Sequence, residues 1–265
     1  MMFEDDRTSV PRAYTALPDS PDHPDPVEDL KRSIEWCHAQ SDGNLRAIGI
    51  QIGSRFDLKD EPLIEALVRR GATVYPDSRG KVARLPAGPV LAYRPLPQTL
   101  WQIEDHRGPS AIAAVGITGP SHFRHAFTPT KSVGAQPWVS AYNPKHLGGP
   151  VIEAKTPVVS DPVIWEALKT FTNMINSSTG LSHSSDRSSV TEGLTKLKAD
   201  GHNFSPDDLL AGALRLNWKG SAAVELRELA LEINAGKQKR FRKMLRPDIV
   251  EIWRAEANSA TPFDH

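Results

Sequence analysis

Apolar residues between positions 46 and 117 occur in short runs, and these runs alternate with amphipathic segments. The runs are rich in branched side chains, which is typical of buried strands. The pattern predicts strands at 47–52, 72–75, 89–93 and 111–117, with helices over about 60–70 and 96–106. Strand, helix and strand at this spacing favour right-handed parallel units, and the run 111–117 is apolar on both faces, as a central parallel strand must be.

These elements predict a three-layer α/β domain with a mostly parallel sheet, of the Rossmann-like or flavodoxin-like kind. A helix should precede them, because Asp25 can cap it, Pro26 suits its first position, and apolar residues such as Leu30 and Cys37 share one face. On that face Cys37 is expected to be a core thiol rather than a nucleophile. A last, weak strand is predicted over 138–142.

After Val159 the pattern becomes helical, beginning with the strong helix start Ser160-Asp161-Pro162. Further helices are expected over about 186–200, 205–217 and 221–233, with a final one from 247 onward. The pair over 205–233 has the size of a helix-turn-helix. Its second helix carries Glu225 and Glu228 and few hydrogen-bond donors, which argues against direct reading of base edges in the major groove.

Composition and these elements together divide the chain into five parts. Residues 1–25 are rich in proline and aspartate and are predicted to be a disordered arm. The α/β domain is expected over 26–150, a linker over 151–158, a helical domain over 159–258, and a disordered tail over 259–265.

The 265-residue chain holds 32 basic and 32 acidic residues and a single cysteine. One cysteine excludes a framework of disulfides within the chain and favours a reducing, cytoplasmic setting. No apolar stretch approaches the length of a membrane span, and the acidic N-terminus does not read as an export signal. The sequence identifies no cofactor and does not predict the oligomeric state.

Charge is balanced only in the sum, because the two signs are segregated along the chain. Residues 1–29 contain eight acidic and two basic residues, whereas residues 237–246 contain six basic residues and no acid. The six are Lys237, Lys239, Arg240, Arg242, Lys243 and Arg246. The plain interpretation is an acidic tail and a basic helix, both solvated, and the functional one is an element that binds anions, with nucleic-acid phosphate or an acidic protein surface as its target.

Candidate chemistry follows two of the predicted strands, since the carboxyl ends of parallel strands form the usual ligand crevice. After the first strand, Ser54 and Arg55 could hold an anion, although neither glycine-rich nucleotide fingerprint is present. After the run 111–117 come Thr118, Gly119, Ser121 and His122, a cluster with hydroxyl donors and a histidine suited to acid or base work. His122 and His125 are close enough to share a metal, but a third ligand is missing, so no metal site is predicted.

Three functions remain open at this point. The leading hypothesis is a binding or regulatory protein, in which the α/β domain docks a ligand and the basic helices contact nucleic acid or an acidic partner. The second is an enzyme for a small anionic substrate, with Arg55 as anion clamp and His122, beside Ser121, as general acid or base. The third is a structural subunit of a larger assembly.

Overall fold

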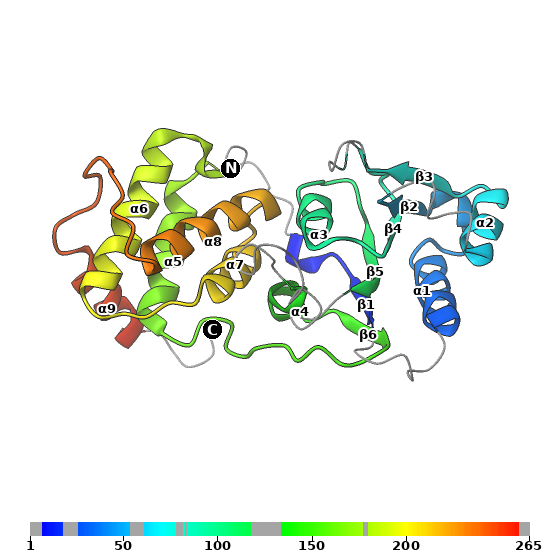
Figure 1. The fold of residues 1–265 in the computed structure, drawn as a ribbon, viewed down its shortest axis with the longest axis horizontal. Helices are drawn as coiled ribbons and strands as arrows, with labels where there is room; N and C mark the ends of the chain where they lie inside the picture. The colour runs from blue at the N-terminus through cyan, green and yellow to red at the C-terminus, as the bar shows by residue number, and fades with distance from the viewer. Residues whose placement is uncertain are drawn as a thin grey trace. The chain divides into compact units, whose positions relative to one another are not determined.

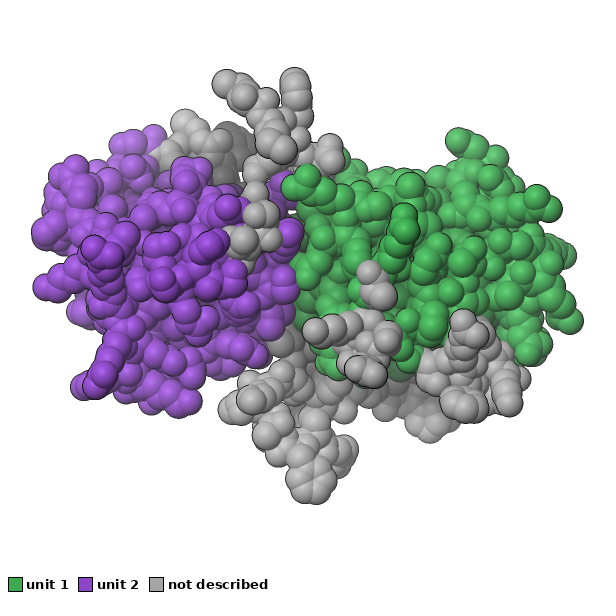
Figure 2. Space-filling view, turned by 90° about the horizontal axis from the view of Figure 1, so that it is seen from above, with its two compact units in different colours: residues 1–153 green, residues 154–265 purple. Residues whose placement is uncertain are grey.

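The computed structural model describes residues 7–17, 26–53, 61–77, 82, 84–117, 134–176 and 180–259. The chain forms two compact units, residues 1–153 and residues 154–265, drawn in green and purple in Figure 2. All described strands belong to the first unit, and the described part of the second unit is built from helices and their connections.

The first unit contains a sheet of six strands, in which all the pairs described are parallel. The strands are β1 (Arg12–Ala16), β2 (Gly49–Ile52), β3 (Thr73–Pro76), β4 (Pro89–Tyr93), β5 (Ala111–Ile117) and β6 (Lys145–Gly148), in the spatial order β3-β2-β4-β5-β1-β6. The predicted α/β fold, followed by an all-helical region, is confirmed. Because the strands run in one direction, their carboxyl ends meet at one edge of the sheet and their amino ends at the other.

Helices cover both faces of this sheet (Figure 1). The helices α1 (Pro26–Ala39) and α2 (Pro62–Arg69) lie on one face, and α3 (Pro97–Glu104) and α4 (Gln136–Tyr142) lie on the other. Two short 3₁₀ turns, η1 (Arg7–Ser9) and η2 (Leu45–Ala47), precede β1 and β2. This arrangement is the expected consequence of right-handed crossovers, since connections that move in opposite directions along the sheet cross opposite faces.

The core beneath α1 and α2 is built from the strand residues that face these helices. Leu91 of β4 pairs with Ile50 of β2 and with Ala113 of β5, and all three are fully buried. Cys37 of α1 belongs to the same apolar cluster, and burial raises the pKa of its thiol. The prediction that Cys37 is a core thiol is therefore confirmed.

The strand β1 corrects the interpretation of residues 1–25 as a disordered arm. Residues 12–16 lie inside the sheet between β5 and β6, and all five are buried. Composition could not reveal this strand, because the backbone groups that bind it on both sides belong to residues about 100 or more positions further along the chain. Its neighbour β6 was not predicted either.

The predicted strand over 138–142 is also wrong, since these residues belong to helix α4. The aromatic and branched residues favoured a strand. The stronger signal was Pro137, which suits the first turn of a helix and removes a ladder donor from a strand. Asn143 ends the helix in the left-handed conformation, with φ of 44°.

A buried ion pair connects β1 to the helices α3 and α4. Arg12 donates from Nε and Nη2 to the two oxygens of Glu104 at 2.9 and 2.7 Å, and the side chains are 2% and 1% exposed. Trp138 donates from Nε1 to the same carboxylate at 2.8 Å, and the guanidinium of Arg12 lies 3.6 Å from the ring centre of Tyr142. One carboxylate at the end of α3 thus holds side chains from β1 and α4.

The second unit consists of five described α-helices and a 3₁₀ turn. They are α5 (Pro162–Met174), η5 (Gly180–Ser182), α6 (Ser184–Ala199), α7 (Pro206–Arg215), α8 (Gly220–Asn234) and α9 (Ile249–Ser259). Helix α5 packs against α6, α7 and α9, and it is capped by Asp161 as the sequence suggested. Phe171 of α5 and Trp253 of α9 meet edge to face, with Gly193 of α6 close against both rings, so a side chain at Gly193 would collide with the ring of Phe171.

Replacing Glu104 with glutamine should destabilise the first unit by about 3 kcal/mol, because the buried Arg12 guanidinium loses its counter-charge. Urea unfolding followed by pulsed hydrogen exchange, on peptides from β1 and β5, measures the loss in this unit alone. Glu28→Gln is the matched control, since Glu28 pairs with Lys31 on an exposed surface and its loss should cost less than about 1 kcal/mol. Equal stability of the two variants would contradict the role given to Glu104.

Candidate functional site

The predicted ligand residues at the carboxyl edge of the sheet lie outside the described residues. They are Ser54 and Arg55 after β2, and Thr118, Gly119, Ser121 and His122 after β5. The strands that lead to them are described, and β2 and β5 are separated only by β4. These two strands therefore end at the same edge of the sheet, about 10 Å apart at the usual strand spacing.

A buried polar group is described near this edge, on the face covered by α3. Gln51 of β2 is fully buried and donates from Nε2 to Asp77 at 2.6 Å, and Thr99 of α3 donates to the other oxygen of Asp77 at 3.1 Å. Burial raises the pKa of Asp77, and the two hydrogen bonds only partly offset it. The Oε1 atom of Gln51 is buried and accepts no hydrogen bond within the described structure, so an acceptor remains open there.

The basic segment, residues 237–246, is not a helix, contrary to the expectation of basic helices. Its backbone between α8 and α9 is irregular. Lys239 and Phe241 are half-buried, whereas Arg240, Arg242 and Lys243 are exposed. The alternation of half-buried and exposed positions over 239–242 directs Arg240 and Arg242 to the solvent side.

Acidic neighbours divide the six basic side chains of this segment into two groups. Glu232 pairs with both Lys237 and Lys239, and Asp248 accepts two hydrogen bonds from Arg246, at 3.0 and 2.8 Å. The other group consists of Arg240, Arg242 and Lys243, and none of these three makes a hydrogen bond or an ion pair with a described residue. The uncompensated positive charge is thus concentrated in the middle of the segment.

The carboxylate of Glu192 in α6 fixes the end of the basic segment. Its Oε2 atom accepts hydrogen bonds from the backbone N–H groups of Met244 and Leu245 at 2.6 and 2.9 Å, and Lys196 pairs with the other oxygen, Oε1, at 3.4 Å. Burial would raise the pKa of Glu192, but the two N–H groups and the ammonium outweigh it and lower the pKa. The amino group of Lys196 also donates to the carbonyl of Arg246 at 2.6 Å.

The helix pair expected over 205–233 is present as α7 and α8, but α8 has few available groups that could form hydrogen bonds with the edge of a base. Arg227 is 6% exposed and donates from Nε to Asp207 at 2.5 Å, so its guanidinium is already engaged. Glu228 is exposed on the same helix. The arrangement agrees with the sequence argument against α8 as a recognition helix.

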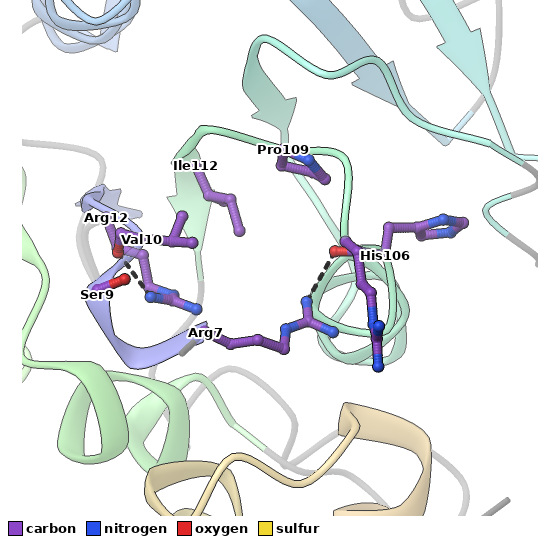
Figure 3. A pocket seen from close by; sticks show the side chains of 8 residues that line it. Arg7, Ser9, Val10, Arg12, His106, Pro109 and Ile112 are labelled. Atoms are coloured by element: carbon purple, nitrogen blue, oxygen red, sulfur yellow. Dashed lines mark hydrogen bonds between the residues drawn. The ribbon is translucent and has the colours of Figure 1, made fainter. Parts of the chain in front are cut away.

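The structure adds a pocket that the sequence did not predict, at the amino edge of the sheet (Figure 3). Its volume is about 240 Å³. The lining residues come from the segment that enters β1 and from the connection between α3 and β5, and they are Arg7, Ser9, Val10, Arg12, His106, Arg107, Pro109 and Ile112. The pocket exists because β1 and β5 are parallel neighbours, so the segments that precede them meet at one edge.

Among the described residues, the lining of this pocket includes three arginines and no acid. A signal was available in the sequence, since Arg7 and Arg107 stand a few residues before Arg12 and Ile112, which pair with each other in the sheet. The sequence did not predict the pocket, because it did not reveal β1 and because the usual ligand crevice of a parallel sheet lies at the carboxyl ends of its strands.

Comparison with known proteins finds a family model that matches part of the chain. Residues 160–254 match a family model described as a domain of unknown function (DUF1889), and no curated protein or solved structure matches the chain. The matched region includes α5 to α8, the basic segment and part of α9, and its description names no activity. Within the described structure, no helix combines the length and hydrophobicity needed to cross a membrane.

Replacing Glu192 with alanine should release the end of the basic segment, because the N–H groups of Met244 and Leu245 lose their acceptor. Amide hydrogen exchange should then become at least tenfold faster at these two positions. Glu228→Ala removes an exposed acid from α8 and should leave both rates unchanged. Since the pKa of Glu192 is lowered by folding, the protection should be complete above its unfolded value, about 4.3, and be lost as the pH falls through the lower folded value.

Unchanged exchange at both amides in Glu192→Ala would show that this carboxylate does not hold the segment.

Proposed function

We propose that the helical unit binds nucleic acid through the backbone phosphates, with the basic segment as the contact surface. The observation that supports this most directly is the set of three exposed cations, Arg240, Arg242 and Lys243, that acidic neighbours leave uncompensated. Lys237, Lys239 and Arg246 add to the local field, but their charges are shared with Glu232 and Asp248. Arginine suits this role because its planar guanidinium can donate two hydrogen bonds to one phosphate.

Contacts of this kind position a protein on nucleic acid without reading its sequence. The basic segment has an irregular backbone and is fixed to α6 and α8 through Glu192 and Glu232, so it presents its cations as a loop rather than as a helix that could enter a groove. Half-buried Phe241 separates Arg240 from Arg242 and is better placed to anchor the loop than to stack on a base. The α/β unit would then supply the ligand-dependent, regulatory part of the protein.

A second candidate function is ligand binding or catalysis at the carboxyl edge of the sheet. It is favoured by the open acceptor on Gln51 and by the position of β2 and β5 on either side of β4. In this proposal Ser54, Thr118 and Gly119 bind a small anionic substrate, Arg55 clamps its charge, and His122, next to Ser121, exchanges a proton with it. Histidine suits proton exchange near neutral pH because its ordinary pKa is close to 6.5.

The three uncompensated cations predict the salt dependence of DNA binding. In fluorescence anisotropy with a labelled 20-base-pair duplex, a plot of log K against log salt concentration should have a slope of about −2.7, since each neutralised phosphate contributes about −0.9. Arg240→Gln should weaken binding and bring the slope about 0.9 closer to zero. Arg246→Gln changes the net charge equally, but Arg246 is already paired with Asp248, so the slope should stay close to that of the parent protein.

Absence of binding at 20 mM salt, or equal effects of the two substitutions, would remove the basis of the nucleic-acid proposal. Polyglutamate serves as the competitor. If it displaces the duplex at equal charge concentration, the segment recognises acidic polymers in general, as expected for an acidic protein partner in a larger assembly.

For the carboxyl-edge site, a thermal-shift screen of small phosphorylated and carboxylated metabolites is the appropriate test. A ligand at a hundred times its Kd should stabilise the folded protein by about 2.7 kcal/mol. Arg55→Ala and His122→Ala should each abolish the shift, whereas Arg69→Ala, at an exposed position of α2, should not. A shift that persists in both site variants places the ligand elsewhere and overturns this proposal.

A further inference from the structure

The pocket at the amino edge has features of a ligand site that is separate from both surfaces discussed so far. Two stretches of chain build it. Arg7, Ser9 and Val10 precede β1 and Arg12 is its first residue, whereas His106, Arg107 and Pro109 lie between α3 and β5 and Ile112 lies near the start of β5 (Figure 3). It lies at the edge of the sheet opposite to the predicted carboxyl-edge residues, and it belongs entirely to the first unit.

We propose that this pocket binds a compact organic anion, with a carboxylate or phosphate group facing the arginines and a small apolar body against the opposite wall. The charge of the lining carries the first half of this proposal. The described lining residues include three arginines and no acid, and Glu104, the buried acid that pairs with Arg12, also lies 3.6 Å from Arg7. Arg107 is exposed and makes no ion pair with a described residue, so an anion in the pocket would find a positive potential there.

The three arginines have different roles in this environment. Arg12 is bound to both oxygens of Glu104 and to the carbonyl of Val10, so it contributes mainly its charge. Arg7 donates from Nη2 to the carbonyl of His106 at 2.9 Å and lies 3.6 Å from Glu104. Arg107 is exposed and makes no hydrogen bond or ion pair with a described residue.

Arg107 is therefore the cation most able to turn toward an anion. Arg7 also removes an electrostatic obstacle. The carboxyl end of a helix carries partial negative charge, and α3 ends next to the pocket, but the carbonyl of His106 in this turn is covered by the guanidinium of Arg7.

The apolar wall carries the second half of the proposal. Val10, Pro109 and Ile112 line the pocket together with the arginines, and Figure 3 shows the side chains of Val10, Ile112 and Pro109 grouped on one side of the opening, above that of Arg7. Such a wall forms no hydrogen bonds with a hydrated inorganic ion, but burying hydrocarbon against it is favourable in free energy. The volume of about 240 Å³ lies below the range of 300–1,000 Å³ usual for larger organic ligands, so a small ring or a short chain is the appropriate size.

Three ligands test the need for charge and the need for an apolar body separately. Benzoate has both the negative charge and the apolar body, benzyl alcohol has only the apolar body, and inorganic phosphate has only the charge. Isothermal titration calorimetry on the full chain at low salt should show saturable binding of benzoate, at least tenfold weaker binding of phosphate, and no binding of benzyl alcohol. Arg107→Gln should weaken the binding of benzoate about tenfold. Arg69→Gln makes the same charge change at an exposed position on α2, across the sheet, and should leave the affinity unchanged.

Failure of the parent protein to bind benzoate, or equal affinities in Arg107→Gln and Arg69→Gln, would overturn the proposal. Tighter binding of phosphate than of benzoate would refute the role of the apolar wall. Two further variants separate this site from the other proposals. Arg240→Gln and Arg55→Ala should both bind benzoate as the parent protein does, whatever they do to DNA binding or to the metabolite screen.

Discussion

The buried pair of Arg12 and Glu104 is the interaction on which the first unit depends. It places a full charge from β1 in a space that is nearly closed to solvent, and it is tolerable only because the two side chains meet through two hydrogen bonds and Trp138 satisfies the carboxylate further. The strand β1 joins β5 to β6, so the pair also determines whether β6 has a neighbour in the sheet. The carboxylate at the end of α3 thus fixes a strand that the chain contributes nearly a hundred residues earlier.

The same interaction shapes the amino-edge pocket. Because Arg12 pairs with Glu104, the segment before β1 lies next to the turn after α3. Arg7 belongs to the first of these stretches and Arg107 to the second. The two basic regions of the protein therefore differ in kind. In the pocket the cations surround a cavity, one of them is neutralised by a buried acid, and size and hydrocarbon contact can select a ligand. In the basic segment three exposed cations face solvent, so the nucleic-acid binding proposed for it would be governed by salt and by the number of phosphates contacted.

The sequence predicted the elements whose identity depends on their own residues. The strands β4 and β5 are continuous apolar runs, α1 and α5 carry their apolar faces within one segment, and α5 also carries its cap, Asp161, so local pattern was sufficient for them. The local pattern failed to predict β1, because its five residues include the polar residues Arg12 and Thr15, which are typical of a solvent-exposed segment. They are buried because Glu104 accepts the arginine and because the hydroxyl of Thr15 accepts a hydrogen bond from the N–H of Gly116 at 2.9 Å. Both partners are distant in sequence, and no local rule points to them.

At the candidate sites, too, the sequence predicted what depends on local pattern and not what depends on contacts between distant residues. That the residues after β2 and β5 share an edge follows from parallel strands, and the sequence could predict it. The sequence could not predict which acidic residues pair with the basic ones, since this pairing depends on the three-dimensional structure. The ten residues from Lys237 to Arg246 read as one block of six equal charges, yet Glu232 lies five residues before Lys237 and neutralises part of the block through two lysines, and Asp248 holds Arg246. Tertiary anchoring through Glu192, rather than helix formation, then decides which three cations reach solvent, so the number of effective charges is a property of the fold and not of the composition.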